Sequence, residues 1–184
     1  MSVMRYAICF VILALLLAAV SCGDKQGVVP QQGFIGLQEF SVTSESTGLE
    51  TYAKGIIYVR ENEGENNGYH VEILAWVEID PSDWAGVGVY ILCGWEVTGI
   101  TSSDAHLVDK TSVWSTVCGG SSEWFQCVAI ERGAGSLVIE LDSTSNEQNP
   151  WPGVLKVTVG VGSDEKDGIR IQYPDYQEIE IPLN

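Results

Sequence analysis

Tyr69-His-Val-Glu-Ile-Leu-Ala-Trp-Val-Glu-Ile79 is the stretch of sequence that decides the fold. Every second residue is tyrosine, valine, isoleucine or alanine, and histidine, glutamate, leucine and tryptophan occupy the positions between them. Because successive side chains of a strand point to opposite faces of a sheet, this alternation predicts a β-strand with one face in an apolar core. The other face is mostly solvated, with Leu74 and Trp76 as its apolar exceptions.

Short segments of the same β-branched and aromatic character lie on both sides of this strand. They include Thr51–Arg60, Val87–Cys93, Thr111–Cys118, Glu123–Arg132 and Val154–Val161. Turn residues separate them, and Gly86 and Gly88 indicate a bulge or a close backbone approach. Ser102–Lys110 is predicted to be a loop, and no stretch of this region has a helical period with caps. About ten short strands of this kind predict an all-β fold, a two-sheet antiparallel β-sandwich over residues 34–184.

Three pieces of this pattern occur in a familiar order. A strand runs into Asp80-Pro81, and Leu137-Val-Ile-Glu-Leu141 is followed by a loop and by Gly153-Val-Leu-Lys-Val-Thr-Val159. This order resembles cohesin-like and other immunoglobulin-like modules of secreted bacterial proteins. The resemblance covers about half of the domain in pattern and includes almost no motif, so it implies the architecture and no partner.

The amino-terminal residues predict the location of the chain. Arg5 precedes an uncharged apolar run, Tyr6–Val20, that is shorter than the roughly 20 residues needed to span a bilayer as a helix. A removed signal peptide over residues 1–21 therefore fits better than a permanent span. Leu17-Ala-Ala-Val-Ser-Cys22 resembles the lipobox of bacterial lipoproteins, which implies a lipid on Cys22 and attachment to the membrane through it.

Two other interpretations of the leader remain open. Ala19-Val-Ser21 also fits an ordinary signal-peptidase site, which would release a soluble protein, and Tyr6–Val20 could stay uncut as a signal anchor. In each case the remaining chain lies outside the cytoplasm, and with a lipid on Cys22 it is anchored in the cell envelope. Residues 22–33 are polar and lack a period, which predicts a flexible tether before the sandwich domain.

The composition limits the partners. The chain has 25 acidic residues against 9 lysines and arginines, a formal net charge of −16. Such a surface repels phosphate backbones, so nucleic acid is excluded as a partner. The acidic segments Glu61–Gly68 and Asp164–Asp167 contain oxygen ligands for calcium, but neither has the spacing of a dedicated calcium loop. With only two histidines, His70 and His106, a zinc site is not expected either, and we predict no cofactor.

Three cysteines remain beyond the lipidation position. Outside the cytoplasm they allow one internal disulfide. Gly119-Gly-Ser-Ser122 can turn the chain between Cys118 and Cys127, which favours a bridge between these two and leaves Cys93 as a buried thiol. Pairing of Cys93 with either of the others remains an alternative.

Catalytic motifs are absent from the sequence. No Gly-x-Ser-x-Gly elbow occurs, and acidic pairs such as Asp80 with Asp83 or Glu123 with Glu131 are expected by chance in so acidic a chain. We therefore predict that the protein is not an enzyme.

The tryptophans give a more specific indication of function. Trp84 and Trp151 lie in proline-containing turns, where a ring can stack on a carbohydrate, anchor a protein partner or simply cap the sandwich. The sequence predicts a lipid-anchored binding or structural module on the cell surface that uses Trp84 and Trp151. Its alternatives are a glycan-directed hydrolase and an accessory subunit of an envelope complex that accepts a partner strand at a sheet edge.

Overall fold

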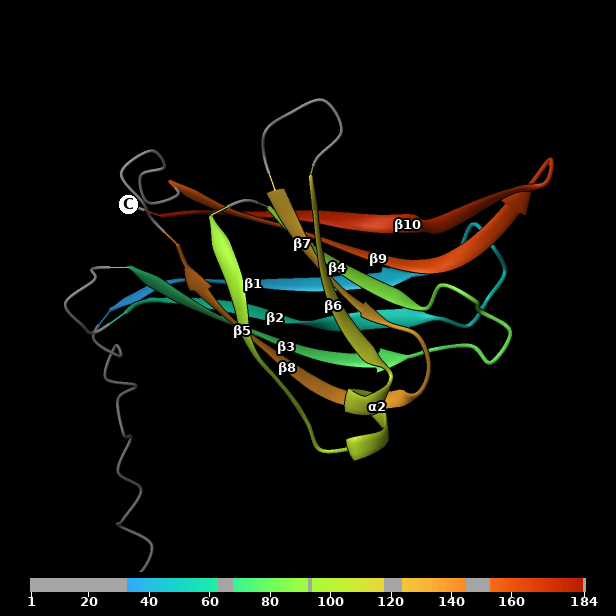
Figure 1. Cartoon of the computed structure of the whole chain (residues 1–184), viewed down its shortest axis with the longest axis horizontal. Helices are drawn as coiled ribbons and strands as arrows, with labels where there is room; N and C mark the ends of the chain where they lie inside the picture. The colour runs from blue at the N-terminus through green and yellow to red at the C-terminus, as the bar shows by residue number, and fades with distance from the viewer. Residues whose placement is uncertain (1–32, 63–67, 93, 118–123, 145–152, 184) are drawn as a thin grey trace, which may run out of the picture. The chain divides into compact units, whose positions relative to one another are not determined.

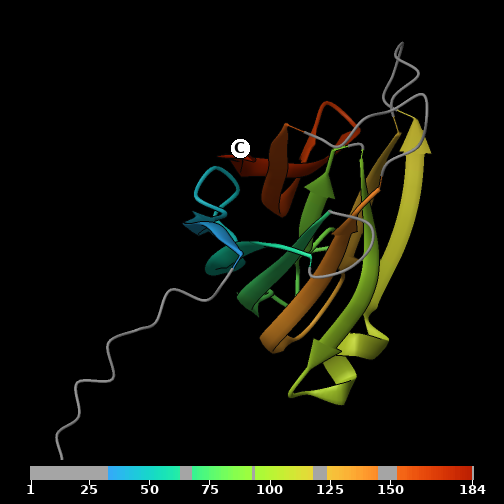
Figure 2. The same ribbon diagram turned by 90° about the vertical axis from the view of Figure 1, so that its left-hand side faces the viewer.

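A computed structural model describes residues 33–62, 68–92, 94–117, 124–144 and 153–183 of the chain. These residues form two antiparallel sheets of five strands each, with the two sheets stacked face to face (Figures 1 and 2). The prediction of an all-β, two-sheet antiparallel sandwich is therefore confirmed.

The first sheet, called sheet A, has the strand order β1-β2-β3-β8-β5. Its strands are β1 (Phe34–Thr43), β2 (Tyr52–Glu61), β3 (Tyr69–Glu78), β8 (Ala134–Ser143) and β5 (Trp95–Ser102). Sheet B has the order β10-β9-β4-β7-β6. Its strands are β10 (Ile169–Pro182), β9 (Val154–Lys166), β4 (Val87–Ile91), β7 (Trp124–Ile130) and β6 (Thr111–Val117). The chain crosses between the sheets after β3, β4, β5, β7 and β8, so the order within each sheet is set by distant segments.

One short helix, α2 (Ala105–Asp109), lies where the sequence predicted only a loop. The Asp104 carboxylate accepts a hydrogen bond from the His106 N–H at 2.9 Å and caps the helix, while Leu107 is buried in the core. A helix of this length is too short to produce a periodic pattern. Within the part of the chain that the structure describes, no helix is both long and apolar enough to cross a membrane.

The alternation that predicted β3 also places its residues. Val71, Ile73 and Val77 are fully buried between the sheets, whereas Leu74 and Trp76 are exposed on the outer face of sheet A. The strands β1, β2, β4, β5, β7, β8, β9 and β10 contribute to the same core. Its largest buried side chains include Ile57, Val59, Ile139 and Leu141 from sheet A and Ile91, Ile130 and Leu155 from sheet B. Burial of each such side chain contributes about 1.5–3 kcal/mol to folding.

Glutamine side chains join the two sheets at both sides of the sandwich. At one side the Ser41 N–H of β1 donates to Gln177 Oε1 of β10 at 3.0 Å. At the other the Val97 N–H of β5 donates to Gln126 Oε1 of β7 at 2.7 Å. The outermost strands of sheet A therefore each have a backbone donor already occupied, which reduces their capacity to accept another strand.

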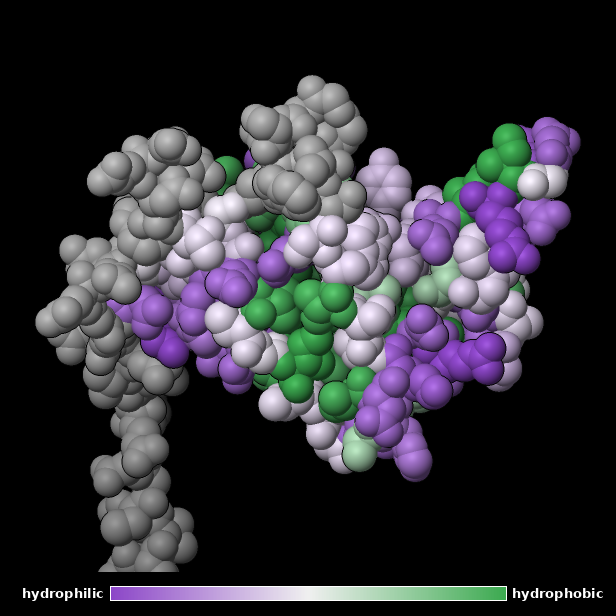
Figure 3. All heavy atoms as spheres, in the orientation of Figure 1, coloured by the Kyte–Doolittle hydropathy of each residue, from purple (hydrophilic) through white to green (hydrophobic). Residues whose placement is uncertain are grey.

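Apolar atoms also reach the surface. They gather over β5 and β6 on the face shown in Figure 3, and Val113 of β6 is exposed. The β9–β10 hairpin projects from the sandwich in Figure 1 and carries the exposed Ile169 close to its turn. These residues show that charged side chains do not cover the whole surface of this acidic protein.

Candidate functional site

Of the residues predicted from the sequence to contact a ligand, the structure describes Trp84. Its ring is 40% exposed, and the Arg170 guanidinium lies 5.3 Å from the ring centroid. The Trp84 N–H donates to Ser163 Oγ at 3.2 Å, so the residue ties the β3–β4 loop to the β9–β10 hairpin. One face of the ring is thus occupied by a cation–π contact. Trp151, the second predicted ligand residue, and Cys22, the predicted lipidation site, lie outside the described residues.

Asp83 has a structural role. Its carboxylate is 3% exposed; Oδ2 accepts from Thr51 Oγ1 at 2.6 Å, and Oδ1 accepts from the N–H groups of Ala85 and Gly86 at 2.9 and 3.0 Å. These bonds fix the β3–β4 loop to the end of the β1–β2 hairpin. A carboxylate held in this way is not available for glycoside cleavage.

Asp80, three residues earlier, caps its own turn. It accepts from the Ser82 N–H at 2.8 Å and from the Glu50 N–H at 3.1 Å. The Ser82 side chain also donates to this carboxylate, and these hydrogen bonds hold the pKa of Asp80 below its usual value. The carboxylate has a local turn-stabilising function. Glu123, from the other acidic pair noted in the sequence, lies outside the described residues.

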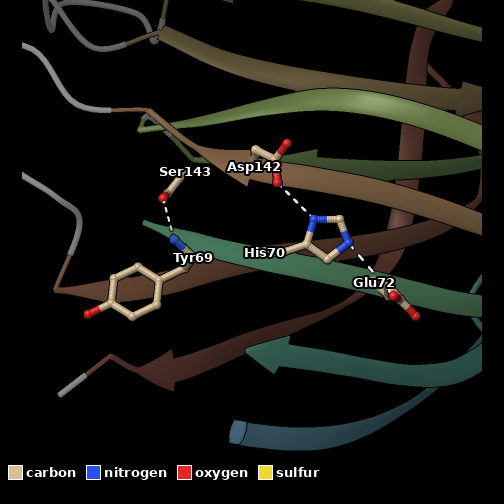
Figure 4. Close-up of polar contacts among 5 residues, drawn as sticks. All are labelled: Tyr69, His70, Glu72, Asp142 and Ser143. Atoms are coloured by element: carbon tan, nitrogen blue, oxygen red, sulfur yellow. Dashed lines mark hydrogen bonds and ion pairs between the residues drawn. The ribbon is translucent and has the colours of Figure 1, made fainter. Parts of the chain in front are cut away.

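The two histidines lie on different elements and do not form a metal centre. His70 is on the outer face of sheet A, with Nδ1 2.7 Å from Asp142 Oδ1 and Nε2 3.7 Å from Glu72 Oε1 (Figure 4). His106 is exposed in α2. In the segments that the structure describes, no three histidine, cysteine, aspartate or glutamate side chains form a group that could hold a metal ion.

Cys127 is buried on the outer face of sheet B, and its thiol has no disulfide partner among the residues that the structure describes. Burial raises its pKa to about 12, which keeps it protonated and unreactive at ordinary pH. Its neighbours across the ladder are Trp114 of β6 and Tyr90 of β4. The predicted partner, Cys118, lies outside the described residues, so the Cys118–Cys127 bridge stays a prediction. The register gives it no support, because the residue opposite Cys127 is four positions before Cys118.

Four aromatic rings, called the aromatic strip, cover Cys127 and the centre of the outer face of sheet B. They come from four strands: Trp114 of β6, Phe125 of β7, Tyr90 of β4 and Tyr173 of β10. The ring centroids are 5.9 Å apart for Trp114 and Phe125, 5.7 Å for Phe125 and Tyr90, and 5.8 Å for Tyr90 and Tyr173. These separations fall within the range for favourable aromatic pairs. Tyr90 is also 6.2 Å from Trp114, in an edge-to-face contact.

Tyr173 reaches the strip because of a bulge in β10. The residue has a φ of 54°, in the left-handed region, where the β9–β10 register shifts. A Cβ placed on Gly88 or on Gly160 would lie 2.6 Å from the Tyr173 side chain. Only glycine at these two positions leaves room for the Tyr173 side chain to lie against the sheet. Of the two glycines for which a bulge or a close backbone approach was predicted, Gly86 has the close backbone neighbour, since a Cβ there would clash with the Ile130 carbonyl oxygen, whereas the close neighbour of Gly88 is the Tyr173 side chain.

A hollow of about 290 Å³ opens beside the strip. It forms because the small Thr158 of β9 is paired with Tyr90 on one side and with Glu178 of β10 on the other. Its lining is completed by neighbouring residues of the same strands and of β7. These are Ile91, Leu92, Phe125, Lys156, Val157, Ile179 and Glu180. The hollow therefore combines aromatic rings with carboxylates and an amine.

Charged groups stand at the rim of this hollow. Lys156 Nζ lies 2.6 Å from Glu180 Oε1, and this bond raises the pKa of Lys156. The charge of Glu178 acts in the same direction, so the amine stays protonated through the physiological range. Burial raises the pKa of Tyr90 to about 12, so its hydroxyl stays neutral. The site presents charged donors and acceptors beside a neutral aromatic surface.

Sequence reasoning did not identify this site. Its rings and charges occupy outward positions of strands whose alternation was visible, but only the pairing of β10, β9, β4 and β7 brings them together. No family model matches the chain, and no curated protein sequence matches it. The site is therefore interpreted from its own residues.

Proposed function

We propose that this protein is a lipid-anchored, extracytoplasmic β-sandwich binding module, and that it contacts its ligand at the hollow beside the aromatic strip. The observation that carries the proposal is this ring-lined hollow on the outer face of sheet B. Ligand sites are typically concave and largely apolar, with a few polar groups that fix orientation. The volume of about 290 Å³ is at the lower end of the usual range, which suits a short segment of a ligand.

The character of this face supports binding over a purely structural role. An antiparallel sheet of a sandwich usually presents polar side chains to water on its outer face. Here the centre of the face carries four rings, and Trp114 remains 39% exposed although Phe125 and Tyr90 pack beside it. Cys127 beneath them is already fully covered. The exposed part of the strip thus offers apolar area that adds little to folding but is available to a ligand.

Two features make the alternative functions less suited to this geometry. Glycoside hydrolysis needs two carboxyl groups on either side of the bond to be cleaved. Glu178 and Glu180 project from one face of one strand, and Glu180 is engaged by Lys156. Strand addition needs free edge donors, and Gln177 and Gln126 each occupy one donor on β1 and β5, the two edge strands of sheet A.

The binding surface is tested by filling the hollow. Thr158→Phe places a ring between Tyr90 and Glu178, and Thr101→Phe makes the same change on the outer face of β5 in sheet A as a matched control. The assay is saturable co-sedimentation of the exported protein with cell envelopes of its host. We expect Thr158→Phe to weaken binding about tenfold, a loss of about 1.4 kcal/mol, and Thr101→Phe to leave it unchanged. Equal binding by both variants would exclude the hollow as the contact surface.

The anchor is tested separately at Cys22. Membrane fractionation and mass spectrometry of the full-length protein should recover acyl-modified material in the membrane, and Cys22→Ala should move the protein to the soluble fraction. Recovery of the wild-type protein as soluble, acyl-free material would refute the anchor and leave the binding surface unaffected.

A further inference from the structure

We propose that the ligand of this hollow is a neutral glycan, with a sugar ring packed against Tyr90 and its hydroxyl groups bonded to Glu178 and Lys156. This inference rests on the proposed function and adds the chemical class of the ligand. It follows from three properties of the site: the rigidity of its rings, the pairing of donors with acceptors, and the local charge.

The Tyr90 ring is held in place before any ligand arrives. Trp114 contacts it edge to face at an interplanar angle of 88°, and Tyr173 does so at 75° from the other side. Phe125 packs at 5.7 Å. A ring fixed by three neighbours loses little side-chain entropy when a ligand binds. The C–H face of a sugar can pack against such a surface, since the face of an aromatic ring carries negative partial charge.

The polar groups match hydroxyls. Glu178 lies across Thr158 from Tyr90, and Lys156 with its partner Glu180 occupies the adjacent cross-strand row. A carboxylate only accepts hydrogen bonds and an ammonium group only donates them, whereas a hydroxyl does both. Vicinal hydroxyls of one sugar can therefore donate to Glu178 and accept from Lys156. Bonds of this kind to charged groups are roughly twice as strong as those between neutral groups.

Charge selects among glycans and against other ligands. The positive charge of Lys156 is offset by Glu180, so Glu178 leaves a local negative excess on a chain of net charge −16. Sulfated, phosphorylated or uronic-acid ligands are repelled by such a surface. A folded protein partner typically needs about 800 Å² on each side. Such a contact would extend far beyond this one hollow, whereas its volume of about 290 Å³ suits a short sugar segment.

Affinity gel electrophoresis of the exported protein tests the ligand class. Each gel contains one polysaccharide, either a neutral β-glucan, xylan or mannan, or the anionic polygalacturonate. The test variants are Glu178→Gln, Thr158→Phe and Tyr90→Leu. The control variant is Trp76→Leu, on the outer face of sheet A. We expect at least one neutral polysaccharide to retard the wild-type protein and polygalacturonate to leave its mobility unchanged. Glu178→Gln should weaken retardation about fivefold, because a charge-assisted bond becomes a neutral one.

The control and the blocking variants decide the result. Trp76→Leu should retain binding, and Thr158→Phe and Tyr90→Leu should weaken it about tenfold. Tyr90→Leu uncovers Cys127, so it counts only if its circular dichroism matches that of the wild type; Glu178→Gln and Thr158→Phe test the site without that risk. Retardation by no neutral polysaccharide, equal retardation by polygalacturonate, or equal loss in Trp76→Leu would overturn the proposal.

Failure of the ligand class differs from failure of the binding surface. If Thr158→Phe weakens envelope binding but no neutral glycan retards the protein, the hollow binds another class, such as a protein, and the glycan proposal is refuted. If Thr158→Phe leaves envelope binding intact, the proposed function itself is refuted.

Discussion

The buried carboxylate of Asp83 gives the sharpest quantitative test of the structure. Asp83→Ala removes three hydrogen bonds, from Thr51 Oγ1 at 2.6 Å and from the N–H groups of Ala85 and Gly86 at 2.9 and 3.0 Å. A hydrogen bond to a charged group contributes about 1.5–3 kcal/mol, so at the low end three of them contribute about 4–5 kcal/mol. The variant also no longer has the desolvation cost of a buried carboxylate, which offsets part of this loss of stability. We expect the free energy of unfolding to fall by about 3–5 kcal/mol.

Two further variants show how much each hydrogen bond of Asp83 contributes to the free energy of unfolding. Asp83→Asn keeps an oxygen for the N–H groups of Ala85 and Gly86 and changes only the contact with Thr51, so a loss of about 1–2 kcal/mol is expected. Thr51→Val removes the hydroxyl that donates to Asp83 and that also accepts from the Asp80 N–H at 3.1 Å. This leaves two polar groups unpaired and should cost about 1–3 kcal/mol.

The measurement is urea unfolding at pH 7, followed by tryptophan fluorescence and circular dichroism, with the free energies compared at equal m-values. Small domains have a total free energy of unfolding of about 5–15 kcal/mol, so the destabilisation of Asp83→Ala should be easy to measure. An Asp83→Ala protein within about 1 kcal/mol of the wild type would refute the reasoning. The carboxylate would then not stabilise the fold, and a role in glycoside cleavage would need to be reconsidered.

Three other predictions concern different parts of the sandwich. Cys127, buried and with a pKa of about 12, should resist iodoacetamide at pH 8 in the folded protein and react once the protein is unfolded without reductant, as located by peptide mass spectrometry. Resistance after unfolding would instead indicate a disulfide of Cys127 with Cys118 or Cys93. Gly160→Ala should lower the free energy of unfolding by about 1–3 kcal/mol, since its methyl group would displace Tyr173; unchanged near-ultraviolet circular dichroism would contradict this. The pKa of Asp80 is lower in the folded protein than its ordinary value, so its stabilising effect is present above about pH 4 and is lost as the pH falls through the folded-state pKa. Asp80→Asn should therefore show a shallower loss of stability between about pH 5 and pH 3 than the wild type, and parallel curves would count against it.

The sequence alone determined the class of the fold and the core face of its clearest strand. Alternation from Tyr69 to Ile79 was sufficient, because a strand has a period of two and one apolar face must leave water. Gly86 indicated a close backbone approach before its partner, Ile130, was known. The leader, with Cys22, predicts the cellular location by the same local reasoning. Each of these inferences depends on residues that are neighbours in the chain.

Only the tertiary structure decided the candidate site. Tyr90, Phe125 and Glu178 belong to three strands, and their adjacency depends on the order β10-β9-β4-β7-β6. Long-range pairing sets that order, and an outward residue has the same local pattern whether its neighbour is a ring or an acid. The tertiary structure likewise buried Asp83, which the sequence presented as one acid among 25. Local periodicity specifies which way a side chain points, whereas the side chain it meets depends on where a distant strand pairs.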